Sequence, residues 1–232
     1  EQHFGVSQKE KIKSLRSNVH VLALTATPIP RTLQMSLVGL RDLSIISTAP
    51  LNRQNINTEV IDFNDEKIIS AIEYELSRNG QVYYVCPRIN ELKEVEDFLK
   101  RKLPNVKYQI AHGQMPSKNL KNTMIDFYNN EFQLLLCTTI VESGLDLQKT
   151  NTMIIHNSDK FGLAQLYQLR GRVGRSKTRA YAYLTTHPTK QLTPNAKKRL
   201  GVMQTLDSLG AGFSLASPQH FCVGSIINCS QS

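Results

Sequence analysis

Short apolar runs alternate with amphipathic stretches along most of the chain. A continuous apolar run is typical of a strand buried on both faces, and apolar residues at helical spacing predict a helix that packs on such a sheet. Asn64 is a favourable helix cap and Gly80 a helix stop, so the stretch between them is predicted to be one helix. The pattern predicts strands at 20–27, 43–48, 81–87, 106–113, 132–139, 151–157 and 179–186, and helices at 64–80, 89–103, 117–131, 163–170 and 195–210.

Strand–helix alternation of this kind predicts βαβ units, and therefore an α/β fold with a parallel sheet and helices on both of its faces. Residues 81–186 supply about five strands, which is enough for one complete domain. Residues 1–48 hold only about two strands and a helix, and they resemble the end of another domain. Residues 48–60 are predicted to be a linker. On the helix at 64–80, the face toward the sheet is predicted to carry Ile68, Ile69, Ile72 and Leu76.

Polar residues follow the predicted strands at the ends where ligands bind. In open parallel sheets, ligands bind beyond the carboxyl ends of the strands. Threonine hydroxyls, backbone N–H groups and arginine side chains at such an edge suit contacts to phosphate and sugar. In chain order, these residues are Thr25 and Thr27, then Arg88, then His112 and Gly113, then Thr138 and Thr139, then Gly144 and Asp146.

A dense group of arginines lies in the run "QLYQLRGRVGRS". Arg172 and Arg175 are three positions apart, so they share a face of a helical turn. Gly171 and Gly174 carry no Cβ atom and allow another surface to approach closely. Two planar, permanently charged guanidiniums suit one phosphate group, and an arginine that contacts a γ-phosphate is worth about 10³ to 10⁵ in rate. The alternative is a solvated basic turn that pairs with surface carboxylates.

The composition of the chain indicates which class of partner it binds. The 232 residues carry a formal net charge of +9, which favours a polyanionic partner, nucleic acid before a membrane. No apolar run approaches the roughly 20 residues of a membrane span, and the first residues lack the apolar core of a signal peptide, so a cytoplasmic location is predicted. The four cysteines show no Cys-x-x-Cys spacing, and neither a metal site nor a disulfide framework is expected.

Three motifs carry a family resemblance. Gln168-x-x-Gly171-Arg172-x-Gly174-Arg175 resembles motif VI of the superfamily 2 helicases and translocases. Residues 138–147, "TTIVESGLDL", resemble motif V, and residues 24–32, "LTATPIPRT", resemble motif III. "TATPIPRTL", "HGQM" and "FGLAQLYQLRGRVGRS" are similar to the bacterial transcription-repair coupling factors and to the fork-reversing helicases of the RecG type. "LRDLSIISTAP" and "LGAGFSLAS" are more similar to the coupling factors, and the resemblance covers about residues 1–217.

The resemblance implies a role for each candidate residue. Toward the nucleotide, Arg172 and Arg175 would be arginine fingers that face ATP on a preceding lobe, Gln168 would contact its phosphates, and Gly144 and Asp146 would lie near its ribose. Toward DNA, Thr138 and Thr139 would hold a phosphate, and His112 and Gly113 would line the same DNA track with Arg88. Thr25 and Thr27 would couple the nucleotide state to the grip on DNA. Simpler alternatives stay open for some of them. Thr25 and Thr27 could end a strand and cap a helix, Asp146 could be a turn residue, and His112 could be an ordinary strand-end residue.

The same resemblance implies how the chain divides. Residues 1–50 would be the C-terminal remnant of a first motor lobe, 51–190 the second RecA-like lobe, 191–217 the start of a helical translocation module, and 218–232 an atypical, poorly ordered tail. No G-x-x-x-x-G-K-[ST] phosphate cradle occurs in the sequence, and "EQHFGV" resembles only the end of the family's Mg²⁺-binding motif. The main residues that bind ATP and Mg²⁺ are therefore expected on another lobe, and the chain alone is expected to be inactive.

The function implied is that of a fragment of an ATP-dependent double-stranded DNA translocase that displaces stalled RNA polymerase in transcription-coupled repair. Its partners would be double-stranded DNA, the first motor lobe, and RNA polymerase and repair factors that bind through other modules. Two alternatives stay open: a fragment of a fork-reversing DNA helicase, and a nucleic-acid-binding remnant without motor activity. An RNA helicase is the weaker rival, because "TATPIPRT" is more similar to the DNA translocases.

Overall fold

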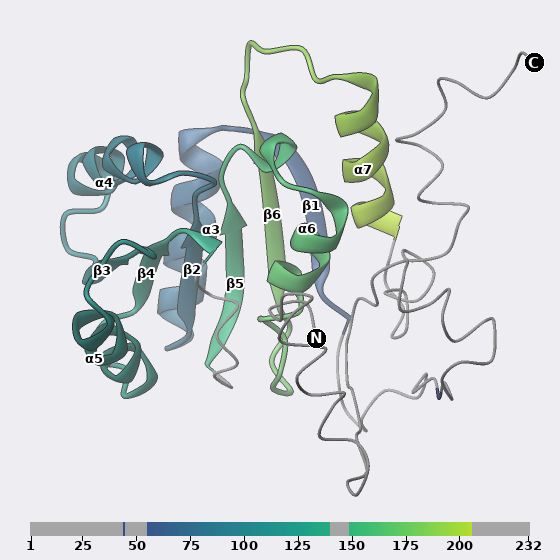
Figure 1. Ribbon diagram of the computed structural model, residues 1–232. Helices are drawn as coiled ribbons and strands as arrows, with labels where there is room; N and C mark the ends of the chain where they lie inside the picture. The colour runs from purple at the N-terminus through teal and green to yellow at the C-terminus, as the bar shows by residue number, and fades with distance from the viewer. Residues whose placement is uncertain (1–43, 45–54, 140–148, 206–232) are drawn as a thin grey trace, which may run out of the picture. The chain divides into compact units, whose positions relative to one another are not determined.

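The computed structural model describes residues 44, 55–139 and 149–205 (Figure 1). Apart from Ser44, these residues belong to one compact unit, residues 48–209. The elements are β1 (Asn57–Asp62), α3 (Asp65–Ser77), β2 (Gln81–Val85), α4 (Ile89–Lys102), β3 (Tyr108–Ala111), α5 (Ser117–Tyr128), β4 (Leu134–Cys137), β5 (Thr150–Ile155), the 3₁₀ helix η3 (Ser158–Lys160), α6 (Leu163–Arg170), β6 (Tyr181–Thr186) and α7 (Pro194–Thr205). The predicted strand at 20–27 lies outside the described residues, as do all residues but Ser44 of the strand predicted at 43–48 and the end of the helix predicted at 195–210.

The strands form a six-stranded sheet in the order β1-β6-β5-β2-β4-β3, and each neighbouring pair is parallel. Helices α3 and α4 cover one face, while α5, α6 and α7 cover the other (Figure 1). This confirms the predicted α/β fold with a parallel sheet and helices on both faces. The carboxyl ends of all six strands therefore lie at one edge of the sheet, and the amino ends lie at the opposite edge.

The apolar runs are continuous because the central strands are buried on both faces. On β2, Val82 and Tyr84 join the core beneath α3 and α4, whereas Tyr83 and Val85 join the core beneath α5, α6 and α7. The Leu134–Cys137 strand, β4, alternates between the two cores in the same way. Burial of one large aliphatic side chain is worth about 1.5–3 kcal/mol, so these doubly buried strands contribute much of the stability of the sheet.

The crossovers place the helices on the faces where they are found. From β1 to β2 and from β2 to β3, the chain moves along the sheet in one direction, through α3 and α4. From β3 to β4 and from β5 to β6 it moves in the other direction, through α5 and α6. Parallel crossovers are almost always right-handed, so opposite directions require helices on opposite faces.

Helix α3 begins after Asn64 as the sequence predicts, but it ends at Ser77, three residues before Gly80, and its buried face differs. The side chain of Asn64 accepts a hydrogen bond from the backbone N–H of Lys67 at 3.0 Å, which caps the helix. Ile68 and Ile72 are fully buried, while Ile69 and Leu76 are only partly buried. Glu75 is also fully buried, and the hydroxyl of Thr152 donates to its Oε2 at 2.5 Å. Arg78 pairs with the same carboxylate oxygen.

The linker predicted at 48–60 is wrong in its second half, because β1 begins at Asn57. This strand pairs with β6 in register from Asn57↔Tyr181 to Asp62↔Thr186. Its residues from Asn57 to Ile61 are half-buried and only Val60 and Ile61 are large and apolar, so the sequence lacks the apolar run that marks the central strands.

Candidate functional site

Three of the predicted site segments meet at the carboxyl-end edge of the sheet. Strands β2, β4 and β3 are neighbours, and their last residues Val85, Cys137 and Ala111 are in register. The chain beyond them supplies the predicted DNA-contacting residues. These are Arg88 after β2, His112 and Gly113 after β3, and Thr138 and Thr139 after β4.

Backbone hydrogen bonds fix this edge. The N–H of Thr138 donates to the carbonyl of Ala111 at 3.2 Å, and the N–H of Cys86 donates to the carbonyl of Cys137 at 2.8 Å. The chain leaving β4 is thereby held between the chains leaving β3 and β2. Thr138 is buried, whereas Thr139 is half-buried.

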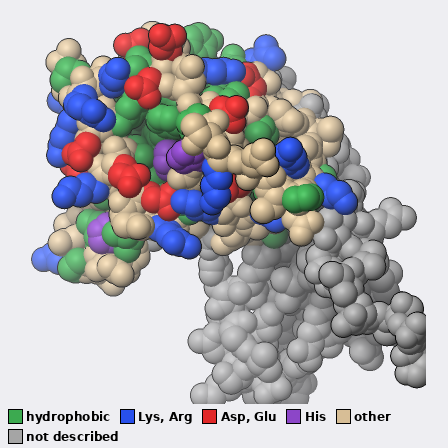
Figure 2. All heavy atoms as spheres, turned by 90° about the horizontal axis from the view of Figure 1, so that it is seen from above, with side chains coloured by type: hydrophobic (Ala, Val, Ile, Leu, Met, Phe, Trp, Pro, Cys, Tyr) green, Lys and Arg blue, Asp and Glu red, His purple; other side chains and the backbone are tan. Residues whose placement is uncertain are grey.

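The side chains at this edge differ in exposure and charge. Arg88 and Gly113 are exposed and His112 is half-buried. Figure 2, which looks from above onto this end of the strands, shows Lys and Arg side chains interspersed with Asp and Glu side chains. The edge is therefore not a uniformly basic surface, and a phosphate contact there depends on particular groups.

The arginines of the predicted motif VI lie at the opposite edge of the sheet, in a segment we call the arginine loop, residues 171–178. It follows α6 and leads to β6, whose amino end pairs with β5 and β1. The hydroxyl of Ser176 donates to Oδ1 of Asn151, near the start of β5, at 3.0 Å. Strands advance about 3.3 Å per residue, so the five residues of β2 separate the two edges by roughly 15 Å.

Gly174 shapes the arginine loop. Its φ is +73°, in the left-handed region that glycine tolerates best. A Cβ at this position would lie 3.0 Å from Cγ1 of Ile56 and 3.1 Å from Cβ of Ala180. The surface that approaches Gly174 is thus the chain's own, from the residues just before β1 and β6. This contact holds Arg172 and Arg175 on either side of the turn.

The third arginine of the run packs inside the lobe. Arg170 is buried, its Nη1 donates to the backbone carbonyl of Met203 in α7 at 3.3 Å, and its guanidinium lies over the ring of Tyr167. Arg172 is half-buried and Arg175 is exposed. Of these three arginines, Arg172 and Arg175 are the more accessible to a ligand.

The positive charges of Arg172 and Arg175 influence the pKa of Tyr83 on β2. Burial raises the pKa of the Tyr83 hydroxyl far above its ordinary value, and the neighbouring Cys137 raises it further, while Arg172 and Arg175 oppose the rise. The two guanidiniums therefore favour the ionised form of this hydroxyl on β2. Gln168, half-buried near the end of α6, precedes them.

Four predicted site residues lie outside the described residues: Thr25, Thr27, Gly144 and Asp146. Their assigned roles stay predictions. Within residues 55–139 and 149–205, no group of three or more His, Cys, Asp and Glu side chains could hold a metal ion. No helix in the same part of the chain is long and apolar enough to cross a membrane.

Sequence reasoning missed two polar features. Asn151 and Ser176 hold the arginine loop, and the only signal for them was a polar residue at the start of an apolar strand and a serine directly after Arg175. The second feature is Glu91, 6% exposed, whose carboxylate accepts from Asn157 at 2.8 Å and from Lys160 at 2.9 Å. It ties the start of α4 to the turn after β5.

Comparison with known proteins places these features in a family. The model of the helicase conserved C-terminal domain matches residues 65–177. The transcription-repair-coupling factors of Rickettsia bellii and Myxococcus xanthus are each 52% identical to the chain over 217 residues, which is 94% of the chain. A chloroplastic ATP-dependent DNA helicase of Arabidopsis thaliana is 52% identical over 93% of the chain.

The chain spans only part of these relatives: 19% of the Rickettsia bellii protein, 18% of the Myxococcus xanthus protein and 26% of the Arabidopsis thaliana protein. Among solved structures, RecG bound to a three-way DNA junction is 27% identical with a TM-score of 0.67, and the match covers 93% of this chain and 34% of RecG. Dbp5 of S. cerevisiae bound to RNA and ADP BeF3 has a TM-score of 0.64 at 16% identity, over 86% of this chain and 53% of that chain, which shows the shared fold alone.

These matches cover the motif VI residues and the α/β lobe that carries them, and they confirm the resemblance drawn from the motifs. The chain belongs to the superfamily 2 helicases and translocases, and its six-stranded parallel sheet with helices on both faces has their RecA-like C-terminal fold.

Proposed function

We propose that this chain is the second motor lobe of an ATP-dependent double-stranded DNA translocase that acts in transcription-coupled repair. The observation that carries the proposal is the placement of two polar sites at opposite edges of one sheet. Arg172 and Arg175 lie at the amino-end edge, and the Thr138, His112 and Arg88 segments lie at the carboxyl-end edge. One rigid lobe can therefore contact a nucleotide and a nucleic acid at the same time.

The arginine loop suits the chemistry of ATP hydrolysis. Water attacks the γ-phosphorus, a new P–O bond forms, the bond to the bridging oxygen breaks, and ADP and phosphate leave with the water's protons. Negative charge spreads over the phosphoryl oxygens in the transition state, and Arg172 and Arg175 would stabilise it. Gln168 would contact the phosphates from the end of α6, and Gly144 and Asp146 would lie near the ribose.

The other half of the nucleotide site would come from a lobe with a phosphate-binding loop, because this sequence contains no G-x-x-x-x-G-K-[ST]. Mg²⁺ would be held there too, because it binds beside the ATP phosphates with few protein carboxylates. Arginines that contact ATP across the space between two lobes would make the lobes close when ATP binds and separate after hydrolysis.

The carboxyl-end edge suits the DNA backbone. Thr138, Thr139 and Gly113 offer hydroxyl and N–H donors, and Arg88 offers a charged fork, all of which fit phosphate oxygens. Such contacts carry no base information, so no sequence preference is expected. Because the same sheet carries both sites, closure of the lobes around ATP would move the DNA contacts along the duplex. Thr25 and Thr27 would link the nucleotide state to this movement.

Displacement of a stalled RNA polymerase is proposed from the high identity to the coupling factors. The likeness to RecG on a three-way junction favours a second candidate, reversal of a DNA fork. The two differ in the substrate that stimulates the motor. Uninterrupted duplex should suffice for a coupling factor, whereas a branched junction should be required for fork reversal.

The test is DNA-stimulated ATP hydrolysis. The purified chain alone should show none. Addition in trans of a lobe that carries the phosphate-binding loop should restore turnover, and Arg172→Ala in this assembly should lower it about 10³-fold or more. Arg101→Ala is the matched control, because it removes the same charge from the exposed last turn of α4. DNA-stimulated turnover by the chain alone, or equal rates for the two variants in the assembly, would contradict the proposal.

A further inference from the structure

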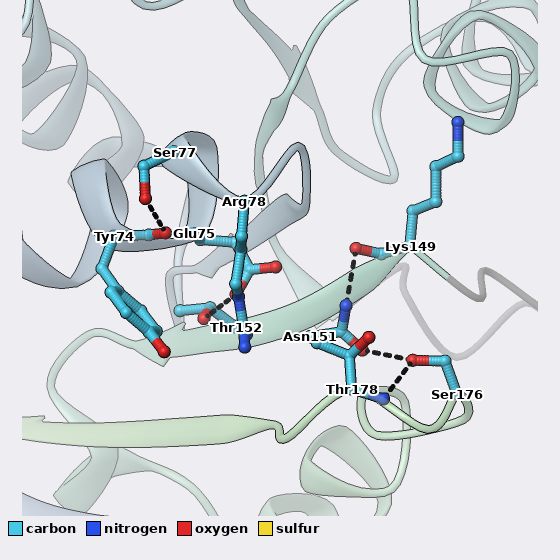
Figure 3. Close-up of polar contacts among 9 residues, drawn as sticks. All are labelled: Tyr74, Glu75, Ser77, Arg78, Lys149, Asn151, Thr152, Ser176 and Thr178. Atoms are coloured by element: carbon cyan, nitrogen blue, oxygen red, sulfur yellow. Dashed lines mark hydrogen bonds and ion pairs between the residues drawn. The ribbon is translucent and has the colours of Figure 1, made fainter.

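The hydrogen bonds that hold the arginine loop converge on one side chain. Asn151 is 4% exposed and lies near the start of β5. Its Oδ1 accepts from the hydroxyl of Ser176 at 3.0 Å, and its Nδ2 donates to the backbone carbonyl of Lys149 at 3.2 Å. Figure 3 shows Asn151 between these two partners, so that a single amide bridges two segments.

Ser176 extends this connection into the arginine loop. Its Oγ accepts a hydrogen bond from the N–H of Thr178 at 3.2 Å while it donates to Asn151. The hydroxyl is thus a junction between the loop backbone and β5 (Figure 3). Since Ser176 directly follows Arg175, the position of this hydroxyl constrains the backbone from which the arginine projects.

The other end of the bridge is equally anchored. The carbonyl of Lys149 also accepts from the N–H of Gln81 at 2.9 Å, which ties it to the start of β2. Lys149 lies two residues after the segment that resembles motif V, residues 138–147. Asn151 therefore connects the chain just after the motif V segment to the motif VI loop through two hydrogen bonds.

We infer that Asn151 and Ser176 are positioning residues that set the placement of Arg172 and Arg175 toward ATP, which rests on the proposed function. Before Arg175, the loop is held by the buried Val173 and by Gly174 against Ile56 and Ala180. After Arg175, the bridge from Ser176 to Asn151 fixes it to β5. A displacement of about 1 Å at a reacting group can cost up to about 100-fold in rate. Loss of the bridge should consequently change turnover more than nucleotide binding.

The experiment measures kcat and KM for ATP in the assembly of the full chain with the lobe that carries the phosphate-binding loop. Asn151→Ala and Ser176→Ala should each lower kcat about tenfold, with KM changed less than about twofold. The double substitution should lower kcat no further, because both remove one connection. Ser176→Thr keeps the hydroxyl and should stay within about twofold of the unchanged chain.

A matched control separates positioning from stability. Thr152→Val removes the hydrogen bond to the buried Glu75 one residue along β5, so it should lower the melting temperature without lowering kcat. Hydrogen exchange in residues 171–178 should accelerate in Asn151→Ala and Ser176→Ala and stay unchanged in Thr152→Val. A kcat for the alanine variants equal to that of Thr152→Val, or unchanged exchange in the arginine loop, would overturn the inference.

The exchange measurement needs no activity. Absence of turnover in the unsubstituted assembly would count against the proposed function. Protection of residues 171–178 would then decide alone whether Asn151 and Ser176 hold the loop, and unaltered protection in both alanine variants would reject that role.

Discussion

Gly174 is the residue on whose identity the arginine loop depends most directly. Its φ of +73° disfavours any side chain, and a Cβ would press on Ile56 and Ala180. Gly174→Ala should therefore lower the free energy of unfolding by about 1–3 kcal/mol, measured by urea denaturation. In the assembly with the second lobe it should also lower ATP turnover, because the arginines would shift.

The chain contains its own control for this substitution. Gly201 lies inside α7, is exposed, and has no atom within 4 Å of a built Cβ. Gly201→Ala should raise the free energy of unfolding by about 0.5–1 kcal/mol, because alanine is the better helix former. If both substitutions shifted stability in the same direction, backbone strain at Gly174 would not be the cause.

His156 gives the lobe a pH dependence of known sign. Burial lowers its pKa below the ordinary value, so below that ordinary value the unfolded chain binds more protons than the folded one. The neutral ring then favours folding above about pH 6.5, and this contribution is lost as the pH falls through the depressed pKa. The charged groups that face it are Glu91, Asp159, Lys160 and His187.

The measurement is the free energy of unfolding at pH 7.5 and at pH 5.5, about one unit on either side of the ordinary histidine value. The unsubstituted chain should lose more stability across this interval than His156→Gln, which cannot titrate. The ring also packs edge-on against Phe63, so the variant should be less stable at both pH values. Equal losses in the two proteins would show that His156 does not drive the pH dependence.

At the scale of elements, burial decides what the sequence could predict. The strands β2, β4 and β5 carry apolar runs because both of their faces are covered, although β2 begins with Gln81 and β5 with Thr150, Asn151 and Thr152. The sequence placed all three strands within a few residues. Strand β1 was not predicted, because it is half-buried and mostly polar. The buried Glu75 on α3 could not be foreseen either, since its partner Thr152 is 77 residues away in sequence.

Helices α6 and α7 are joined by a side chain from the arginine run. Arg170, the last residue of α6, is buried, and its guanidinium donates to the backbone carbonyl of Met203 in α7. Arg170→Met should lower the free energy of unfolding by about 1–3 kcal/mol, because a buried carbonyl loses a charged donor. Hydrogen exchange should then accelerate in α7 more than in α4. Lys198→Met, on the exposed side of α7, should change stability by no more than about 0.5 kcal/mol.

At the scale of the whole lobe, the sheet topology shows where the motif residues lie relative to one another, which the motifs alone do not. The sequence grouped the residues that follow strands, and the register of β2, β4 and β3 brings the described ones to one edge. It could not show where the arginines would lie relative to them. Their place follows from the parallel pairing of β5 with β6, because the chain must return along α6 to the amino-end edge. The distance between the two sites is thus a property of the fold.

That separation predicts that DNA affinity and ATP turnover respond to different arginines. Arg88 and Arg101 are both exposed and stand at opposite ends of the 14-residue helix α4, about 20 Å apart. Arg88→Ala should weaken binding of the chain to duplex DNA and reduce the slope of log affinity against log salt by about one, because one phosphate contact is lost. Arg101→Ala and Arg172→Ala should leave that slope unchanged. Equal slopes for Arg88→Ala and Arg101→Ala would mean that DNA binding follows net charge alone. That result would contradict the assignment of the carboxyl-end edge as the DNA-binding site.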